Sequence, residues 1–100
     1  MIEAELQREV QAAADLRGLL WHHCPHAELC KGKRGFPDLI IAGPRGLLVA
    51  ELKSATGETT VEQDAWGWTI VKPAVPPRYR LWNPRHWEEA VIHRELDSIA

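Results

Sequence analysis

The stretch GFPDLIIAGPRGLLVAELKS, residues 35–54, predicts the centre of the fold. Two short apolar runs, 39–42 and 47–50, are separated by Gly-Pro-Arg-Gly at 43–46. Because both runs are rich in Leu, Ile or Val and are bounded by Gly and Pro, they predict adjacent strands joined by a tight turn. Apart from the polar residues at their outer ends, both faces of each run are apolar. Such strands are typical of a sheet that helices cover on both sides.

Charged residues lie at the outer ends of these two predicted strands. Asp38 precedes the first, while Glu51 and Lys53 end the second and share one face because they are two residues apart. If paired residue numbers sum to 89, Asp38 lies directly opposite Glu51. Pro44 excludes the mirror-image turns that two-residue hairpins favour, so a bulged type I turn with a sum of 90 is the alternative. In that alternative register, Asp38 and Glu51 would no longer lie directly opposite each other.

Two opposed carboxylates, with Cβ atoms roughly 5 Å apart, destabilise a strand pair unless a positive charge compensates. A divalent cation bridging Asp38 and Glu51 would remove the repulsion, and hard oxygen ligands suit Mg²⁺ or Mn²⁺. The residues therefore predict a Mg²⁺ or Mn²⁺ site. Lys53, on the same face, either stabilises charge at a reacting phosphate or forms a plain salt bridge with one of the acids.

These residues also carry a resemblance to a known family. Pro37-Asp38 followed by Glu51-Leu52-Lys53 resembles the signature of the PD-(D/E)XK nucleases. The longer ordered set, which adds Gly35-Phe36, Ser54, Gln63 and Trp66, is similar to the VRR-NUC branch of that superfamily. The likeness is to its small stand-alone members in phages and bacteria, and it spans residues 3–87.

The resemblance implies a metal-dependent endonuclease that hydrolyses phosphodiester bonds in branched DNA, including four-way (Holliday) junctions, as a homodimer. It implies Mg²⁺ or Mn²⁺ as cofactor and the cytoplasm of a bacterial cell, with a phage gene as an alternative source. The implied metal ligands are Asp38, Glu51, the backbone carbonyl of Leu52, and Glu3. The implied catalytic residues are Asp38, Glu51, Lys53, Gln63 and Glu3.

Three of these residues have ordinary structural alternatives. Glu5 is the second candidate for the N-terminal acid, and both Glu3 and Glu5 suit the first turn of a helix because of its dipole. Gln63 stands three residues after Thr60, the spacing of a capping box, so it either caps its own helix or points at the site. Trp66 is expected to belong to the core rather than to stack on a ligand.

The rest of the chain predicts a single α/β domain, residues 1–100, with the order αβββαβα. A central mixed sheet flanked by helices, as in restriction-endonuclease-like PD-(D/E)XK folds, is the expected architecture. The predicted elements are a helix over 2–17 ending at Gly18, an edge strand over 19–23, a loop over 24–34, the hairpin, a helix over 61–71, a Pro-rich break over 72–77, a strand over 78–82 and a helix over 86–99.

Composition narrows the function classes. The 100 residues are 45% hydrophobic and 26% charged, which is ordinary for one soluble domain. No run approaches the roughly 20 apolar residues of a membrane span, and the acidic, amphipathic N-terminus is unlike a signal peptide, so a cytoplasmic location is expected. The net charge of −2 argues against a bulk electrostatic nucleic-acid binder.

Local clusters of cations matter more than the total. Lys31, Lys33 and Arg34 precede the acidic site, and three arginines at 78, 80 and 85 come later; each cluster either contacts phosphates or is merely solvated. Cys24 and Cys30 fit no common zinc spacing, so reduced thiols are favoured over a structural zinc. Besides the endonuclease, a catalytically silent DNA-binding module and a zinc-stabilised interaction module remain as alternatives.

Overall fold

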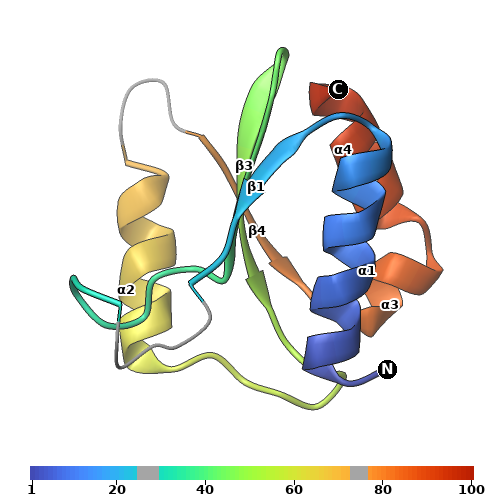
Figure 1. The fold of residues 1–100 in the computed structure, drawn as a ribbon. Helices are drawn as coiled ribbons and strands as arrows, with labels where there is room; N and C mark the ends of the chain where they lie inside the picture. The colour runs from blue at the N-terminus through green and yellow to red at the C-terminus, as the bar shows by residue number, and fades with distance from the viewer. Residues whose placement is uncertain (25–29, 73–76) are drawn as a thin grey trace.

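Helices lie on both faces of a four-stranded sheet in the computed structural model, which describes residues 1–24, 30–72 and 77–100 (Figure 1). Of the described helices, α2 covers one face, and α1, α3 and α4 cover the other. The elements are α1 (Glu3–Leu16), β1 (Leu20–His22), β2 (Leu39–Gly43), β3 (Gly46–Leu52), α2 (Val61–Ile70), β4 (Arg78–Trp82), α3 (Pro84–Glu88) and α4 (Val91–Ile99). The prediction of an α/β domain with helix layers on both sides is confirmed.

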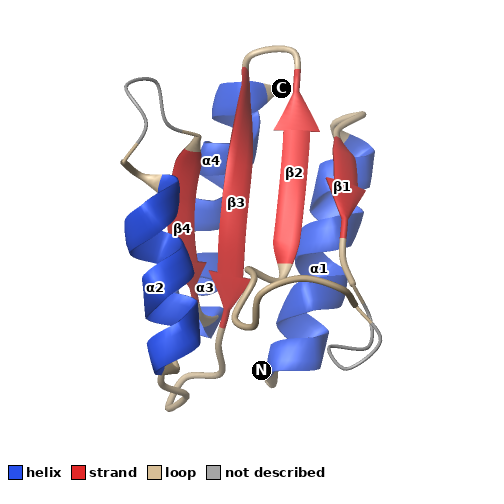
Figure 2. Cartoon of the chain, turned by 90° about the vertical axis from the view of Figure 1, so that its left-hand side faces the viewer, coloured by secondary structure: helices blue, strands red, loops and turns tan. Residues whose placement is uncertain are grey.

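The sheet is mixed, with the strand order β1-β2-β3-β4 (Figure 2). Strand β2 is antiparallel to both β1 and β3, whereas β3 and β4 are parallel. Parallel neighbours need a long crossover connection, and α2 provides it between β3 and β4. The predicted loop over 24–34 and break over 72–77 lie partly outside the described residues.

The hairpin has the register that places Asp38 and Glu51 opposite each other: Gly43 pairs with Gly46, and Leu39 with Ala50. Its two turn residues lack the positive φ of the favoured hairpin turns. Contacts with the C-terminus of α4 hold this turn. The N–H of Arg45 donates to the carbonyl of Ile99 over 3.1 Å, and a Cβ at Gly43 would collide with that same carbonyl oxygen.

The core lies between the sheet and the layer of α1, α3 and α4. The alternation of strands places Leu48, Ala50 and Leu52 of β3 on this side, where all three are fully buried. Glu51, between the last two, therefore faces α2. The remaining buried apolar residues of this core are Leu6, Val10, Ala13, Ala14, Leu19, Leu39, Ile41, Trp82, Ile92, Leu96 and Ile99.

The last helix departs from the prediction. Residues 86–99 were expected to form one helix, but the chain forms α3 and α4, and the order becomes αβββαβαα. Asn83 caps α3 by accepting from the N–H groups of Arg85 and His86, so this helix begins earlier than predicted. Ala90 then adopts a left-handed conformation, φ 61°, at a cost of roughly 1–2 kcal/mol. The turn allows α4 to bury its apolar face, which offsets that cost.

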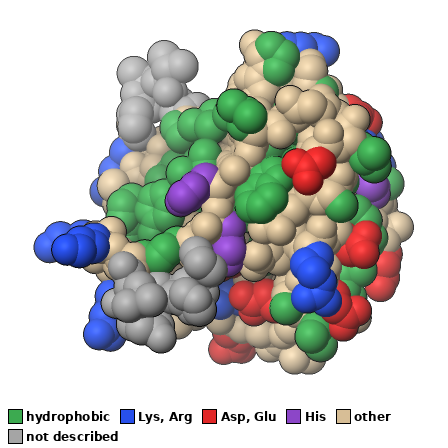
Figure 3. All heavy atoms as spheres, in the orientation of Figure 1, with side chains coloured by type: hydrophobic (Ala, Val, Ile, Leu, Met, Phe, Trp, Pro, Cys, Tyr) green, Lys and Arg blue, Asp and Glu red, His purple; other side chains and the backbone are tan. Residues whose placement is uncertain are grey.

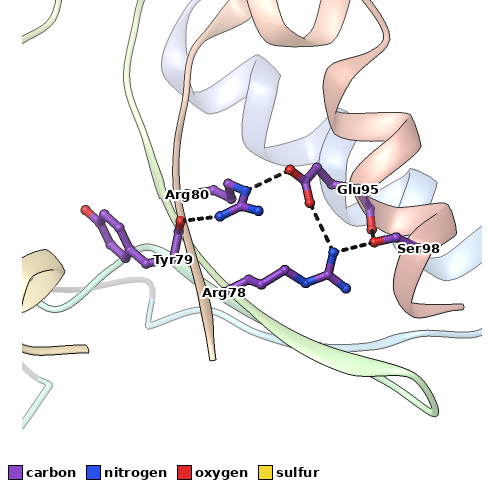
Figure 4. A network of polar contacts seen from close by, with 5 residues as sticks. All are labelled: Arg78, Tyr79, Arg80, Glu95 and Ser98. Atoms are coloured by element: carbon purple, nitrogen blue, oxygen red, sulfur yellow. Dashed lines mark hydrogen bonds and ion pairs between the residues drawn. The ribbon is translucent and has the colours of Figure 1, made fainter. Parts of the chain in front are cut away.

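Polar contacts join β4 to α4 (Figure 4). Arg80 Nε lies 2.7 Å from one oxygen of Glu95, and Arg78 Nη1 lies 3.4 Å from the other and 2.7 Å from Ser98 Oγ. Arg85 pairs with Glu89 at 2.8 Å. The late arginine cluster thus has partners within the fold. No helix in the described residues is long and apolar enough to cross a membrane.

Candidate active site

Asp38 and Glu51 meet where β2 begins and β3 ends, on the face that α2 covers. The pairing of Leu39 with Ala50 continues by one step to these two residues. A hydrogen bond joins their side chains. The hairpin register therefore produces the carboxyl pair that the sequence predicts.

Backbone groups fix the position of Asp38. Its Oδ2 accepts the N–H of Leu52 over 2.8 Å. The Nδ1 atom of His23 lies 2.8 Å from the backbone carbonyl of Asp38, and since a carbonyl only accepts, Nδ1 must carry the proton. Because the N–H and C=O of a strand residue point to the same side, the Leu52 carbonyl is directed towards the strand edge on which Asp38 lies. His23 was not among the predicted site residues, because nothing in the sequence pairs it with residue 38.

Glu51 is buried and carries a proton at neutral pH. Glu51 is 1% exposed to solvent, and its Oε2 atom has no hydrogen-bond partner among the described residues. Burial raises the pKa of Glu51 to about 9, assisted by the hydrogen bond and the charge of Asp38, and opposed by Lys53. Without a cation, the two acids therefore share a proton rather than repel each other as two charges.

Glu3 and Lys53 lie near this pair. Glu3, in the first turn of α1, has its pKa raised by partial burial and then by the charge of Asp38, while Lys53 lowers it. Glu3 also raises the pKa of Glu51, and of the two candidate N-terminal acids it is the one whose charge acts on this pair. None of the ion pairs in the described parts of the chain includes Lys53. The plain salt bridge that was the alternative for Lys53 is therefore not formed.

The donor atoms suit a hard cation. The Oε2 atom of Glu51 is a buried acceptor without a hydrogen-bond donor among the described residues, and Asp38 and the Leu52 carbonyl add oxygen atoms beside it. These residues would hold Mg²⁺ or Mn²⁺. Within residues 1–24, 30–72 and 77–100, however, no three or more His, Cys, Asp and Glu side chains form a group that could hold one ion. Glu3 is thus near the pair without completing a three-carboxylate set.

Gln63 caps α2. Its Oε1 accepts the N–H of Thr60 over 2.9 Å, and its own N–H donates to Thr60 Oγ1 over 3.2 Å. This is the complete capping box that was the structural alternative. Gln63 also lines the hollow that contains Asp38. Its amide oxygen is engaged at the helix terminus, so what remains available to a ligand is the amide NH₂.

A hollow of about 1070 Å³ opens beside Asp38. Its wall includes Lys31, Lys33 and Arg34, none of which forms an ion pair with another described residue. In the space-filling view, Lys and Arg side chains project on the side of α2 and the loop before β2, while Asp and Glu gather over α1 (Figure 3). Lys and Arg side chains also appear at the top of this view and among the acidic side chains, so the separation of charge on this face is only partial (Figure 3). Glu51 and Lys53 lie outside the lining of this hollow.

Trp66 contacts this loop and is not part of the core. Its indole Nε1–H lies 2.9 Å from the carbonyl oxygen of Arg34 and 3.3 Å from that of Lys33. The ring of Phe36 meets Trp66 edge-on, with ring centroids 4.8 Å apart. The expectation of a core tryptophan is therefore wrong. Helical spacing identifies an apolar position but does not distinguish a neighbouring loop from the sheet as its partner.

Cys24 and Cys30 line the same hollow and are joined as a disulfide, with Cα atoms 6.3 Å apart. This separation is within the range that disulfides span. The expectation of reduced thiols is therefore not met.

Comparisons with family models, curated proteins and solved structures returned no match.

Proposed function

We propose that this chain is a Mg²⁺- or Mn²⁺-dependent endodeoxyribonuclease with a PD-(D/E)XK-type fold. The observation that carries the proposal is the buried carboxyl group of Glu51. One of its oxygens is hydrogen-bonded to Asp38, and the other has no hydrogen-bond partner among the described residues. A buried acceptor without a partner is costly, and a fold that keeps one at the end of a central strand is expected to use it. The order of Asp38, Glu51 and Lys53 is the order of the nuclease signature that the sequence resembles.

Each residue has a distinct task in this mechanism. A bound divalent cation supplies a more acidic water and neutralises charge that develops on the phosphate. Asp38, Glu51 and the Leu52 carbonyl would hold that cation, and Asp38 is itself positioned by the Leu52 N–H. Lys53, which has no ion-pair partner in the described chain, stabilises the charge of the pentavalent phosphate. Glu3 adds negative charge that favours the cation.

Lys31, Lys33 and Arg34 bind the DNA backbone in this proposal. They line the hollow that also contains Asp38, and they are exposed cations in a chain of net charge −2. Phosphate contacts of this kind position a nucleic acid without reading its sequence. The late arginines are less suited to this task, because Arg78 and Arg80 both form ion pairs with Glu95.

We further propose that the substrate is branched DNA, such as a four-way junction, and that the protein acts as a homodimer. A two-fold axis relates two active sites in the way that symmetric strands of a junction require. Trp68 on α2 is 73% exposed and, with Leu81 at 46%, offers apolar surface for such an interface.

One competing function has a specific observation in its favour. The described residues contain no three-carboxylate group, and Gln63 is engaged in its helix cap. Both facts suit a catalytically silent DNA-binding module. A zinc-stabilised module is less favoured, because Cys24 and Cys30 are paired with each other.

The decisive experiment compares cleavage of linear duplex, single-stranded, splayed and four-way DNA in Mg²⁺, Mn²⁺ and EDTA. We expect cleavage that requires the cation, is strongest on the four-way substrate, and disappears in Asp38→Ala. Binding without cleavage in either cation would establish the silent module instead. Cleavage that survives in Asp38→Ala would indicate a contaminating nuclease and would remove the support for this site.

A further inference from the structure

The loop that carries the three cations is fastened to α2 through its backbone. Trp66 Nε1 lies within hydrogen-bonding distance of two consecutive carbonyls, those of Arg34 (2.9 Å) and Lys33 (3.3 Å). Trp66 is separated from these residues by about thirty positions in the chain, so the contact is tertiary and not a consequence of local geometry.

Two neighbouring residues reinforce the attachment. Gly35 has a φ of 89°, and a Cβ there would collide with the backbone of Glu62 and Gln63. Only glycine allows the loop to approach the first turn of α2 this closely. Phe36 then places its ring edge-on against Trp66, at an interplanar angle of 86°. The loop is therefore held at three successive residues: by the indole bond at 34, by close packing at 35, and by the aromatic contact at 36.

This attachment engages the carbonyls and leaves the cationic side chains available. Lys33 is exposed, Arg34 is exposed, and neither forms an ion pair with another described residue. Both line the hollow that also contains Asp38. A flexible loop would lose conformational entropy on binding a phosphate chain, and fixing its backbone in advance reduces that cost.

We propose that Trp66 is a positioning residue for phosphate binding: by holding the carbonyls of Lys33 and Arg34, it presents their side chains to the DNA backbone beside Asp38. The proposal rests on the proposed function for the identity of the ligand, but it concerns binding and not the chemical step. The competing interpretation is that Trp66 only stabilises the packing of α2.

The test measures binding of a short linear DNA duplex to the full chain in EDTA, which separates binding from cleavage. Trp66→Phe keeps an aromatic ring against Phe36 and removes the N–H donor. We expect its affinity to fall about threefold to tenfold, the range that one to two net hydrogen bonds represent. The slope of log affinity against log salt should decrease by up to about 1, because a loosened loop makes fewer phosphate contacts.

Trp21→Phe is the matched control. Its indole Nε1 also donates one hydrogen bond, to Asp15 Oδ1 over 2.9 Å, but on the α1 side of the molecule. We expect this variant to bind DNA with the affinity and salt slope of the wild type. An equal loss of affinity in both variants would mean that any lost indole bond weakens binding through stability, which would overturn the proposal.

A double-mutant cycle separates positioning from packing. In the background Lys33→Ala/Arg34→Ala, Trp66→Phe should cause no further loss of affinity, because the side chains that it presents are absent. A loss as large as in the wild-type background would overturn the proposal. If Trp66→Phe does not fold, Trp66→Tyr, which also lacks the indole N–H, takes its place in the same cycle.

The outcomes also separate this inference from the nuclease proposal. Duplex binding that depends on Trp66 in EDTA, without cleavage in Mg²⁺ or Mn²⁺, supports the positioning role and contradicts the nuclease. Cation-dependent cleavage, together with a DNA affinity that Trp66→Phe does not change, supports the nuclease and contradicts the positioning role. Failure of the chain to bind duplex DNA at any salt concentration would overturn the positioning role.

Discussion

At the scale of single residues, the proton held between Glu51 and Asp38 decides how the site responds to its surroundings. Its cause is geometric: Glu51 is the polar residue at the end of a strand whose neighbours Ala50 and Leu52 are buried, and Asp38 lies directly across the hairpin. Burial and the neighbouring charge both raise the pKa of Glu51. The carboxyl is therefore neutral when no cation is bound and becomes a ligand when it loses its proton.

This shift predicts a pH dependence of stability in the metal-free protein. The folded pKa of Glu51 is about 9, above the unfolded value of 4.5, so the folded state binds more protons throughout that window. The contribution of Glu51 to the free energy of unfolding should be most favourable below about pH 5. It should become less favourable as pH rises towards 9, by at most about 1.4 kcal/mol per pH unit. Urea unfolding in EDTA measures this slope. Glu51→Gln should flatten it, and an unchanged slope in that variant would assign it to other groups.

Lys53 is predicted to act on the rate and not on the cation. Lys53→Ala should reduce single-turnover cleavage on the order of 10²–10³-fold, the effect of removing one electrostatic contact to the transition state. Metal affinity should hold or rise slightly, since a positive neighbour of the cation is gone. Asp38→Ala should instead lose metal binding and cleavage together. If Lys53→Ala loses the metal as fully as Asp38→Ala does, Lys53 serves to hold the carboxylates in place.

At the scale of elements, α2 is the least firmly buried of the longer helices. Gly67 is its one buried residue among those described, and its Cα faces the ring of Tyr79 on β4. A Cβ there would lie 2.9 Å from Tyr79 Cε1 and 3.0 Å from Cζ. The glycine thus permits α2 to approach the sheet on the face that carries the acids.

Gly67→Ala is therefore predicted to destabilise the fold. In an exposed helix, alanine in place of glycine stabilises by about 1 kcal/mol, so the sign of the effect identifies the packing. We expect a loss of about 1–3 kcal/mol in the free energy of unfolding, as in other overpacked contacts. Urea denaturation measures this loss. In the double variant Tyr79→Leu/Gly67→Ala, the smaller side chain at 79 makes room for the added Cβ, so the alanine should cost less stability than it does beside Tyr79. A stabilised Gly67→Ala variant would show that Tyr79 moves aside freely.

The sequence predicts elements best where a local pattern and the tertiary fold agree. The hairpin forms in one of the two registers that its turn allowed, and the capping box of Thr60 and Gln63 is one of the two interpretations that their spacing offered. The break between α3 and α4 does not follow, because Ala90 in a left-handed conformation carries no sequence signal. The contact of Trp66 with the Lys33 and Arg34 carbonyls also depends on distant residues, which helical periodicity cannot reveal.

At the scale of the whole molecule, the apolar core and the candidate active site lie on opposite faces of the sheet. The buried apolar cluster lies on the side of α1, α3 and α4, where the C-terminus of α4 also holds the hairpin turn. The acid pair, the cationic loop and the hollow lie on the side of α2. A cation that binds the acid pair would therefore stabilise the end of β3. This strand contributes Glu51 to the face that α2 covers and buried apolar residues to the opposite face.

Metal binding is accordingly predicted to stabilise the whole fold, and to do so more strongly at higher pH. A ligand that binds only the folded state adds about 2.7 kcal/mol at a hundred times its dissociation constant. Binding to Glu51 requires release of its proton, so Mg²⁺ or Mn²⁺ affinity should increase between about pH 6 and pH 9. In the same interval, the metal-free protein becomes less stable. The rise in melting temperature caused by the cation should therefore be larger at pH 9 than at pH 6.

Thermal unfolding with and without each cation, at both pH values, measures this coupling, with Glu51→Gln as the control. Glutamine keeps the shape of Glu51 and a donor towards Asp38, but it has no proton to release and no charge to offer the cation. Its melting temperature should respond weakly to the cation and equally at both pH values. A wild-type protein whose cation response does not change with pH would place the ion elsewhere, since only a ligand with a pKa inside this window links proton release to metal affinity.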